Sequence, residues 1–479
     1  MVAAVKRTEP STQCYQRRSP EQTLWYRTVQ AHFETWLELS SGEFNESPPA
    51  HVEDAFRRYL ECGILAHGFA RAHCDECGHD FLIAFSCKGR GVCPSCNTRR
   101  MVETAAHLTD HVFPKLPVRQ WVLSVPKRLR YYLQRDVALQ GAVLRIFLRE
   151  VERCLREHSS GCDTQARIGA VAFIHRFGSS LNEHVHFHCC IVDGVFEPSA
   201  NDEAAGVDFH AATGLDAATI AGVQARVRRR VLATFARRGL IDKGDSEVMG
   251  SWAHGGGFSV DASVCINEKD RAGLERLLRY CARPPFALEH LQQLDAEHLV
   301  YHSPKPGLDG SCDLVLTPLE LIGKIAALVP PPRSHRHRYF GVLAPNSPLR
   351  AAVIALAPVV VIVPSLSLKD AAGTEEKPRR AVSHYLWAML LARIYEAFPL
   401  SCPICHAQMR IIAFINGAGD VRKILEHIGE SAQQPRIAPA RGPPLWELAE
   451  ASARAGNDPE WDMSVQPAPE IEFDQRVAW

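Results

Sequence analysis

The chain has no net charge, and it has no uninterrupted apolar segment of the length that a membrane helix needs. Its 54 Lys and Arg residues balance 54 Asp and Glu residues, which argues, for the chain as a whole, against a protein built to hold a polyanion. The one stretch that raises the question of a membrane, Ala351 to Leu368, is interrupted by Pro358 and Pro364. A straight spanning helix is therefore disfavoured there, and we expect no membrane association.

Residues 1–20 also lack the apolar segment of an export signal. We therefore expect a cytoplasmic protein in which the sixteen cysteines bind metal or take part in catalysis rather than form a disulfide framework. Aromatic residues make up only 8% of the chain, beside 46% hydrophobic and 23% charged residues, a composition typical of a globular protein. A length of 479 residues predicts two to four domains.

The even overall balance hides an uneven distribution of charge. Between Lys88 and Arg156, Lys and Arg exceed Asp and Glu by nine, whereas from Leu445 to Trp479 the acids are in excess by six. The segment Arg333–Arg350 has four arginines, two histidines and no acid. One charge run is more often just a solvated face, but several basic segments with interleaved aromatics indicate a phosphate-binding surface.

Four cysteines have the spacing of a zinc site. Cys74 and Cys77 form one pair, and after fifteen intervening residues Cys93 and Cys96 form another. Four thiolates leave no open coordination position, so the predicted Zn²⁺ is structural, and the module that it folds would present Arg99 and Arg100. Cys87, inside the same loop, is interpreted as a packed thiol.

A further pair, Cys402 and Cys405, has no partner pair nearby in the sequence. His406, Cys312 or residues further away could complete a second zinc site, but an unmetallated turn is the default interpretation.

Three histidines alternate along one predicted strand. In the segment Asn182–Gly194, His184, His186 and His188 share one face because side chains alternate along a strand. Neighbouring imidazoles on one face can chelate a single cation, although such a strand could also be only part of a core. Asp193 and Gly194 predict a turn that closes a hairpin onto Val195-Phe196.

Among the ten tyrosines, Tyr280 has the best surroundings for a nucleophile. It lies at the edge of the apolar stripe of the predicted helix 268–282, with Arg276 one turn before it and Arg283 at the helix end. A phenol is a poor nucleophile unless cations favour its phenolate, and guanidiniums can do so while also holding a phosphate. A tyrosine that merely covers the core is the alternative, and Tyr301, Tyr131 and Tyr132 are the other candidates.

Periodicity predicts a mixed α/β fold in which helices pack on a sheet. Helices are expected over 20–39, 52–63, 129–157, 217–238, 268–282 and 318–328, and strands over 119–125, 168–177, 185–192, 298–302 and 312–316.

Several separate motifs together resemble one known family. They are the cysteine module, GSSLNEHVHFHCCIVDGVF, LLRYCARPP, RYFGVLAPNSPLR and HYLWAMLLARIYEAFPLSCPIC. The chain is similar, over roughly Thr23 to Gly429, to the zinc-binding-domain transposases of the IS-ninety-one type, which belong to the HUH (His-hydrophobic-His) endonucleases.

The resemblance implies five parts along the chain. They are an N-terminal helical segment (1–62), a four-cysteine, zinc-ribbon-like domain (63–110), an HUH nuclease core with an antiparallel sheet (111–330), a helical C-terminal DNA-binding or accessory region (331–430), and a Pro-rich, acidic tail (431–479).

The resemblance also implies rolling-circle-like transposition in the bacterial cytoplasm, at the nucleoid. His186 and His188 match the family's histidine pair, with His184 as an additional ligand, and the cation is expected to be Mg²⁺ or Mn²⁺. Tyr280 would attack single-stranded DNA at the ends of the element and form a 5′-phosphotyrosine, and the position four residues earlier holds Arg276, which indicates a single-tyrosine enzyme. The residues expected to contact DNA are Arg99, Arg100, Lys127, Arg128, Arg276, Arg283, Arg336 and Arg338.

Other functions remain open at this point. A rolling-circle replication initiator or a relaxase shares the histidine pair and the tyrosine. A zinc-dependent DNA-binding regulator would lack catalysis, and a metal-dependent phosphoesterase would use water in place of the tyrosine.

Overall fold

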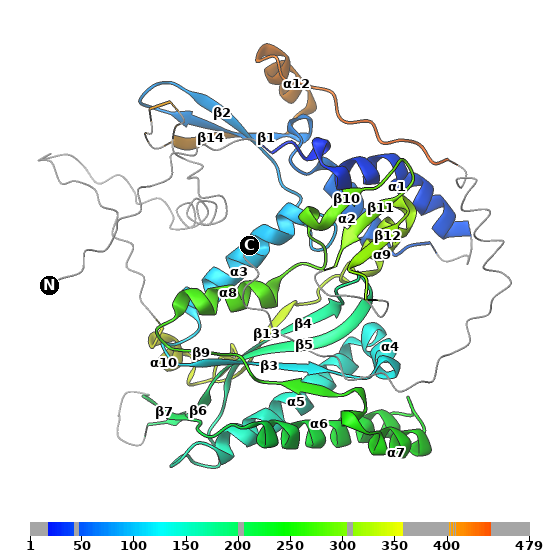
Figure 1. Ribbon diagram of the computed structural model, residues 1–479. Coiled ribbons are helices and arrows are strands. Elements are labelled where there is room, and N and C mark those ends of the chain that lie inside the picture. The colour runs from blue at the N-terminus through cyan, green and yellow to red at the C-terminus, as the bar shows by residue number, and fades with distance from the viewer. Residues whose placement is uncertain are drawn as a thin grey trace, which may run out of the picture. The chain divides into compact units, whose positions relative to one another are not determined.

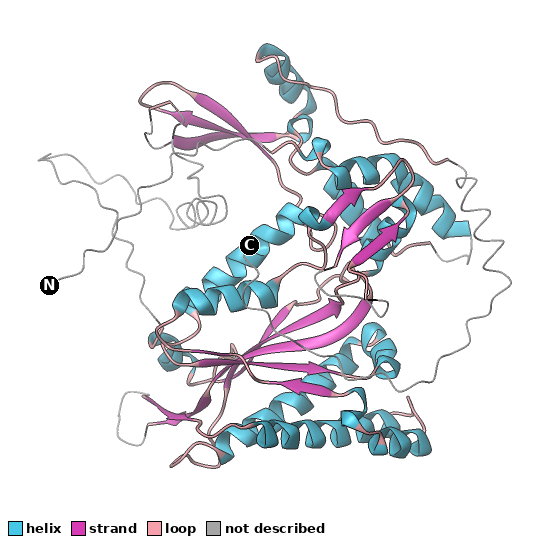
Figure 2. Cartoon of the chain, viewed as in Figure 1, coloured by secondary structure: helices cyan, strands magenta, loops and turns pink. Residues whose placement is uncertain are grey.

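The structure is a computed structural model that describes residues 18–42, 47–199, 206–303, 310–357, 402, 404–405, 407 and 409–441. The chain divides into two compact units. The first contains Met1–Glu103, Phe286–Pro332 and Ile362–Ala449, and the second contains Thr104–Pro285, Arg333–Val361 and Glu450–Trp479. Helices and antiparallel sheets occur in both (Figures 1 and 2), which confirms the predicted α/β class.

The second unit is built on an antiparallel sheet with the strand order β13-β4-β5-β3-β8, in which β9 also pairs with β3. The central strands are long and almost fully buried, as expected for strands covered on both faces. The strands are β3 (Val118–Ser124), β4 (Gly169–Phe177), β5 (Glu183–Val192), β8 (Ser259–Asp261), β9 (Cys265–Ile266) and β13 (His337–Gly341).

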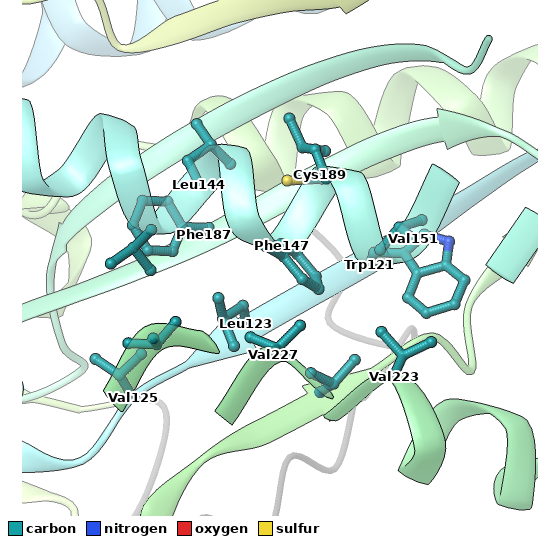
Figure 3. Close-up of a cluster of buried hydrophobic side chains, with 14 of the residues drawn as sticks. Trp121, Leu123, Val125, Leu144, Phe147, Val151, Phe187, Cys189, Val223 and Val227 are labelled. Carbon is teal, nitrogen blue, oxygen red and sulfur yellow. The ribbon is translucent and has the colours of Figure 1, made fainter. Parts of the chain in front are cut away.

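One face of this sheet is covered by α5 (Val137–Glu157) and α6 (Ala217–Arg237). Alternation along β5 directs Phe187 and Cys189 into this layer. Figure 3 shows them beside Phe147 of α5 and Val227 of α6. Each large side chain of this kind contributes about 1.5–3 kcal/mol when it is fully buried, so this layer is the main source of stability in the unit.

The opposite face is covered by α8 (Arg271–Ala282) and by residues of α3 (Pro94–His111) from Ala105 onward. The apolar stripe of α8, with Leu274, Leu277 and Leu278, packs against the side chains that β4 and β5 direct to this side. The remaining elements of the unit are α4 (Lys127–Arg135), β6 (Gly194–Pro198), β7 (Val207–Ala211), α7 (Lys243–Ser251), η3 (His254–Gly257) and α10 (Arg350–Ala355).

The long helix predicted over 129–157 is two helices. Asp136 separates α4 from α5 and leaves the helical conformation with φ −114° and ψ 102°. Its carboxylate accepts a hydrogen bond from the Leu139 N–H at 2.9 Å, so it acts as the N-cap of α5. The hydrophobic periodicity of the sequence continues across Asp136, so the periodicity alone does not reveal that one helix ends there and another begins.

The predicted hairpin at Asp193-Gly194 is also wrong. Strand β6 pairs with β7 rather than with β5. Asp193 instead accepts two hydrogen bonds from the Arg119 guanidinium, at 2.8 and 2.7 Å. This bidentate ion pair lies at the end of β5, where β3 runs alongside.

The first unit has a helical part in which aromatic rings pack together. Phe33 of α1 (Leu24–Gly42) stacks on Phe56 of α2 (Ala50–Glu61), with 4.9 Å between the ring centroids. Two three-stranded antiparallel sheets, β14-β1-β2 and β10-β11-β12, belong to the same unit. The other elements are η1 (Pro20–Gln22), η2 (Leu65–His67), β1 (Phe69–Cys74), β2 (Asp80–Ala84), η4 (Leu288–His290), β10 (Leu291–Gln293), β11 (Leu299–His302), β12 (Asp313–Leu316), α9 (Pro318–Ala327), β14 (Met409–Ile415) and α12 (Ala418–His427).

No helix among the described residues is long and apolar enough to cross a membrane. The charge-free stretch 351–368 begins inside α10, and its part from residue 358 onward lies outside the described residues. The acidic segment after Leu445 lies outside them as well.

A buried carboxylate joins α5 to α6. Glu150 is only 2% exposed and accepts hydrogen bonds from Arg230 and, at 3.0 Å, from Arg226. Burial alone would raise the pKa of Glu150, but the two guanidiniums outweigh it and hold the pKa below its usual value.

We expect Glu150→Gln to lower the free energy of unfolding of the second unit by roughly 2 kcal/mol at pH 7, because both arginines lose their counter-charge. The folded-state pKa lies below the unfolded value of about 4.3, so the carboxylate stabilises the fold above that value. This contribution is lost as the pH falls through the folded-state pKa. Urea unfolding followed from pH 8 to 3 should show the difference from wild type shrinking at the acid end. Glu157→Gln, which removes an exposed partner of Arg153 on the same helix, should change stability by less than about 0.5 kcal/mol.

Candidate active site and metal centres

A cluster of three histidines lies on the face of the central sheet that α8 covers. Alternation along β5 places His186 and His188 on this face, and the antiparallel register places His175 of β4 directly opposite His186. The three side chains offer nitrogen atoms that all lie within 4.8 Å of one another. Two strands therefore supply a preformed group of three imidazoles.

Hydrogen bonds to backbone carbonyls set the tautomer of two of these rings. His186 Nδ1 lies 3.1 Å from the carbonyl oxygen of His184, and His175 Nε2 lies 2.6 Å from that of Cys281. A carbonyl oxygen only accepts, so each ring nitrogen must donate its proton. The lone pair is then on His186 Nε2 and on His175 Nδ1, which is the arrangement that metal-ligating histidines need.

Burial keeps the His175 imidazole neutral. His175 and His188 are 3% and 4% exposed. Burial, reinforced by His186 and Arg283, holds the pKa of His175 well below its usual value. The Nδ1 atom of His175 is buried and has no hydrogen-bond partner among the described residues. A buried neutral imidazole with an unused lone pair is a suitable ligand for a divalent cation.

Gln120 of β3 contacts the third ring. The amide nitrogen of Gln120 lies 2.9 Å from His188 Nδ1, and the Oε1 atom of Gln120 is buried without a partner among the described residues. Exchanging the two ends of the amide would let Oε1 accept a hydrogen bond from His188 Nδ1–H and would leave the His188 lone pair on Nε2. Sequence analysis did not single out Gln120, because its relation to His188 depends on the pairing of β3 with β5.

The structure corrects the identity of the third histidine. His184 shares the face of β5, and its ring lies 4.8 Å from that of His186, but it is outside the group of three. Burial, together with His186 and Arg130, lowers the pKa of His184 to about 2. His175 completes the group instead. The sequence shows His175 on a predicted strand, but only the register of β4 against β5 brings it opposite His186.

Tyr280 lies beside the histidines. Its ring is nearly perpendicular to that of His188, with 5.5 Å between the centroids. The Arg283 guanidinium lies over the Tyr280 ring at 4.6 Å. Burial raises the pKa of Tyr280, and Arg283 opposes that effect. The other tyrosine candidates pack elsewhere: the ring of Tyr132 packs against Phe235, and that of Tyr301 against Phe286.

The predicted DNA-binding residues of the second unit differ in how strongly they are paired. Arg276 is two-thirds exposed and lies 3.8 Å from Asp270, a weak ion pair. Lys127 and Arg128 begin α4, and Arg128 pairs with Asp245. Arg338 lies in β13, directly after Arg336 and His337.

In the first unit, Arg99 pairs with Glu103 at 2.7 Å on α3, and Arg100 donates a hydrogen bond to the Lys88 carbonyl oxygen at 3.0 Å. Both side chains are thus partly committed to contacts within the module.

The four-cysteine site predicted from spacing is wrong in its pairing. Cys93 and Cys96 come together with Cys62 and Cys87, whereas Cys74 and Cys77 come together with Cys402 and Cys405. Cys87, which was interpreted as packing, belongs to a quartet. The spacing of two pairs does not specify which pairs meet, and the partners of Cys74 and Cys77 come from more than 300 residues further along the chain.

Two family models match the chain. Residues 28–125 match a family described as "Transposase zinc-binding domain", and residues 169–350 match one described as "Putative transposase". The two matches together support an IS-ninety-one-like transposase. The first match contains both pairs of the predicted zinc site, and the second contains the three histidines and Tyr280.

The chain is similar to a protein from Sinorhizobium fredii, strain NBRC 101917 / NGR234, that is named "Putative transposase y4qJ". It is 29% identical over 166 residues, which cover 33% of this chain and 39% of the relative. The match thus spans well under half of the relative's length. No solved structure matches the chain. The zinc-binding domain and the cysteine quartets together support structural Zn²⁺ in this chain.

Proposed function

We propose that this transposase nicks and rejoins single-stranded DNA at the ends of an insertion sequence through a 5′-phosphotyrosine on Tyr280, in a rolling-circle-like reaction. The observation that carries the proposal is the position of Tyr280 beside a group of three buried histidines, on one face of one sheet. A nucleophile next to a cation-binding group is what phosphoryl transfer requires.

His175, His186 and His188 would hold the divalent cation. Imidazole nitrogens suit Mn²⁺ and later transition metals better than Mg²⁺, which prefers oxygen ligands, so this donor set favours Mn²⁺ of the two expected ions. When bound, such a cation supplies Lewis-acid polarisation of the scissile phosphodiester. Gln120 is a positioning residue for His188 in this proposal, because it holds the ring through Nδ1.

The chain's own residues perform the transfer. The Tyr280 phenol loses its proton to solvent, and its oxygen forms a bond to phosphorus while the bond from phosphorus to the 3′-oxygen of the preceding nucleotide breaks. That oxygen takes a proton from solvent and leaves as a 3′-hydroxyl. Arg283 favours the phenolate and neutralises the phosphate. One phosphodiester is exchanged for another, so rejoining needs no ATP.

The partner is DNA, and the place of action is the bacterial cytoplasm at the nucleoid. The basic segments Lys88–Arg156 and Arg333–Arg350 supply cations for the phosphate backbone. A replication initiator or relaxase would use the same histidines and tyrosine, but both family matches are to transposases. A regulator without catalysis would give no reason for a buried His175 nitrogen that has no partner among the described residues and lies beside the other two rings.

A covalent-adduct assay tests the nucleophile. A labelled single-stranded oligonucleotide that carries the element's end should form an SDS-stable complex with wild-type protein in Mn²⁺ or Mg²⁺ and none in EDTA. Tyr280→Phe should reduce the yield at least about 1,000-fold, because it removes the oxygen that attacks phosphorus.

Tyr131→Phe is the matched control, because Tyr131 is a 58% exposed tyrosine on α4 in the same unit. It should form the adduct at wild-type yield. A full-yield adduct with Tyr280→Phe would show that another residue attacks, and nicking without any covalent complex would indicate hydrolysis by water.

Direct measurement of Mn²⁺ binding by electron paramagnetic resonance tests the ligand set. We expect His175→Gln to weaken binding by at least about 10-fold, because it removes a ligand. His184→Gln should change the affinity by less than about 3-fold, because His184 lies outside the group of three. The opposite order of effects would restore His184 as the third ligand.

A further inference from the structure

The two cysteine quartets have the dimensions of tetrahedral zinc sites. With Zn–S bonds of about 2.3 Å, two thiolates on one zinc lie about 3.8 Å apart. In the first quartet, Cys62 Sγ lies 3.7 Å from the Sγ atoms of Cys93 and Cys96, and Cys87 Sγ lies 3.5 Å from that of Cys96. These separations are far longer than the disulfide bond of about 2.05 Å.

The second quartet is assembled from distant parts of the chain. The Sγ atoms of Cys74 and Cys405 lie 3.4 Å apart, as do those of Cys77 and Cys402. The family match for zinc binding ends at residue 125, so Cys402 and Cys405 lie outside it.

The backbone of the two Cys-x-x-Cys loops is alike, as expected for two knuckles that share one metal. The N–H of Cys74 donates to the carbonyl oxygen of His79, and the N–H of Cys402 donates to that of Ala407, each at 2.8 Å and each five residues further on. The N–H of Ile404 also points to Cys402 Sγ at 3.4 Å, a contact that favours a thiolate. One knuckle ends β1 and the other precedes β14, and these strands pair with each other.

We infer that the chain binds two structural Zn²⁺ ions, and that the second, at Cys74, Cys77, Cys402 and Cys405, fastens the C-terminal strand β14 to β1. The hydrophobic cluster at this place is small, with four buried residues among those described: Ala72, Cys74, Cys402 and Met409. Such a cluster gives little free energy to hold a strand more than 300 residues away in the chain, whereas a four-thiolate zinc site contributes folding free energy directly.

The test is cobalt substitution of the full-length protein, measured by the sulfur-to-cobalt charge-transfer absorption. This absorption requires thiolate ligands, so a metal bound to the histidines does not contribute to it. Wild type should bind two equivalents of thiolate-ligated metal. Cys402→Ser with Cys405→Ser should lose one equivalent and keep the other. Cys265→Ser with Cys312→Ser, at two exposed cysteines outside both quartets, should lose none.

A single replacement tests the same point without removing a ligand. Cys405 is exposed, and Cys405→His should keep two equivalents while the charge-transfer intensity of one site falls by about a quarter, since one of four thiolates is replaced. An unchanged spectrum, or a wild type with one equivalent, would overturn the second site.

Two arginines come together on the sheet face opposite the histidines. On β13, Phe340 packs with the core that α5 covers, whereas Tyr339 packs with the other core, so Arg338 lies on the α5 side by alternation. The guanidiniums of Arg145 and Arg338 converge on Gly141 of α5. A Cβ atom there would lie 3.4 Å from one and 3.5 Å from the other.

Among the described residues, Arg145, Arg149 and Arg338 form no ion pair. Glu152, a carboxylate nearby, pairs with Arg167 at 3.1 Å and with Arg156 at 3.5 Å. A cavity of about 300 Å³ is lined by Arg145, Arg149, Glu152, Arg167 and Phe340, among others. Arg145 belongs both to the convergence at Gly141 and to this cavity, whose lining has three arginines and one carboxylate. This excess of positive charge favours an anion.

We infer that this groove holds the phosphate backbone of a single DNA strand, outside the cleavage site. The inference rests on the proposed function, because it takes DNA as the substrate. The groove runs between α5 and the edge strand β13, and Arg145 and Arg149 lie along one side of it, where a single backbone can follow the helix.

The test measures the affinity for a fluorescent single-stranded oligonucleotide as a function of salt. Arg145→Gln with Arg149→Gln should weaken binding by roughly 10-fold and reduce the salt slope by about 1.4, at 0.7 for each lost contact. Arg153→Gln, at an exposed arginine of the same helix that pairs with Glu157, should leave both unchanged.

If the wild type binds the oligonucleotide and the double variant has the same affinity and the same salt slope, the inference that this groove binds DNA is wrong. A wild type that binds no oligonucleotide would instead contradict the proposed function. A duplex competitor that displaces the oligonucleotide from wild type as well as a single strand does would overturn the single-strand assignment.

Discussion

The position of the histidine group in the second unit depends on the register of three antiparallel strands. Strand β5 pairs with β4 on one side and β3 on the other, and the side chains of all three alternate between two faces. The histidines lie on one face and Phe187 and Cys189 on the other. A slip of one residue would exchange the faces, so that the imidazoles would enter the hydrophobic layer. The apolar layer under α5 and α6 therefore specifies the position of the polar group on the opposite side.

Hydrogen bonds from residues of the site itself fix the C-terminal end of helix α8 against the sheet. The Nε2–H of His175 donates to the Cys281 carbonyl oxygen, one residue after Tyr280, and Gln120 contacts both His188 and the Cys281 thiol. The apolar stripe of α8 buries Leu274, Leu277 and Leu278 on the same side. The tyrosine thus reaches the histidines because the helix end is fixed by both packing and hydrogen bonds, with Arg283 at the point where the chain leaves the helix.

Local patterns in the sequence were sufficient for what depends on one strand or one helix. The alternation along 184–188 placed His186 and His188 on one face, and the stripe of helix 268–282 placed Tyr280 at its edge. Partners from other segments could not be predicted in this way. His175 joins the group only through the β4–β5 register, and Gln120 only through β3. The spacing within a Cys-x-x-Cys pair does not specify which second pair completes its zinc site. Each pair could therefore form a site with the nearby pair or with cysteines far along the chain. Asp136 was hidden because a cap can interrupt a helix without interrupting its hydrophobic period.

The central claim is that the buried histidines and Tyr280 form one strand-transferring centre. The most direct measurement is mass spectrometry of the covalent complex after nuclease and protease digestion, which identifies the residue that carries the nucleotide. The account predicts a nucleotide 5′-phosphate on the peptide that contains Tyr280, formed only when a divalent cation is present. A nucleotide on any other residue, or a complex that forms equally well in EDTA, would contradict it.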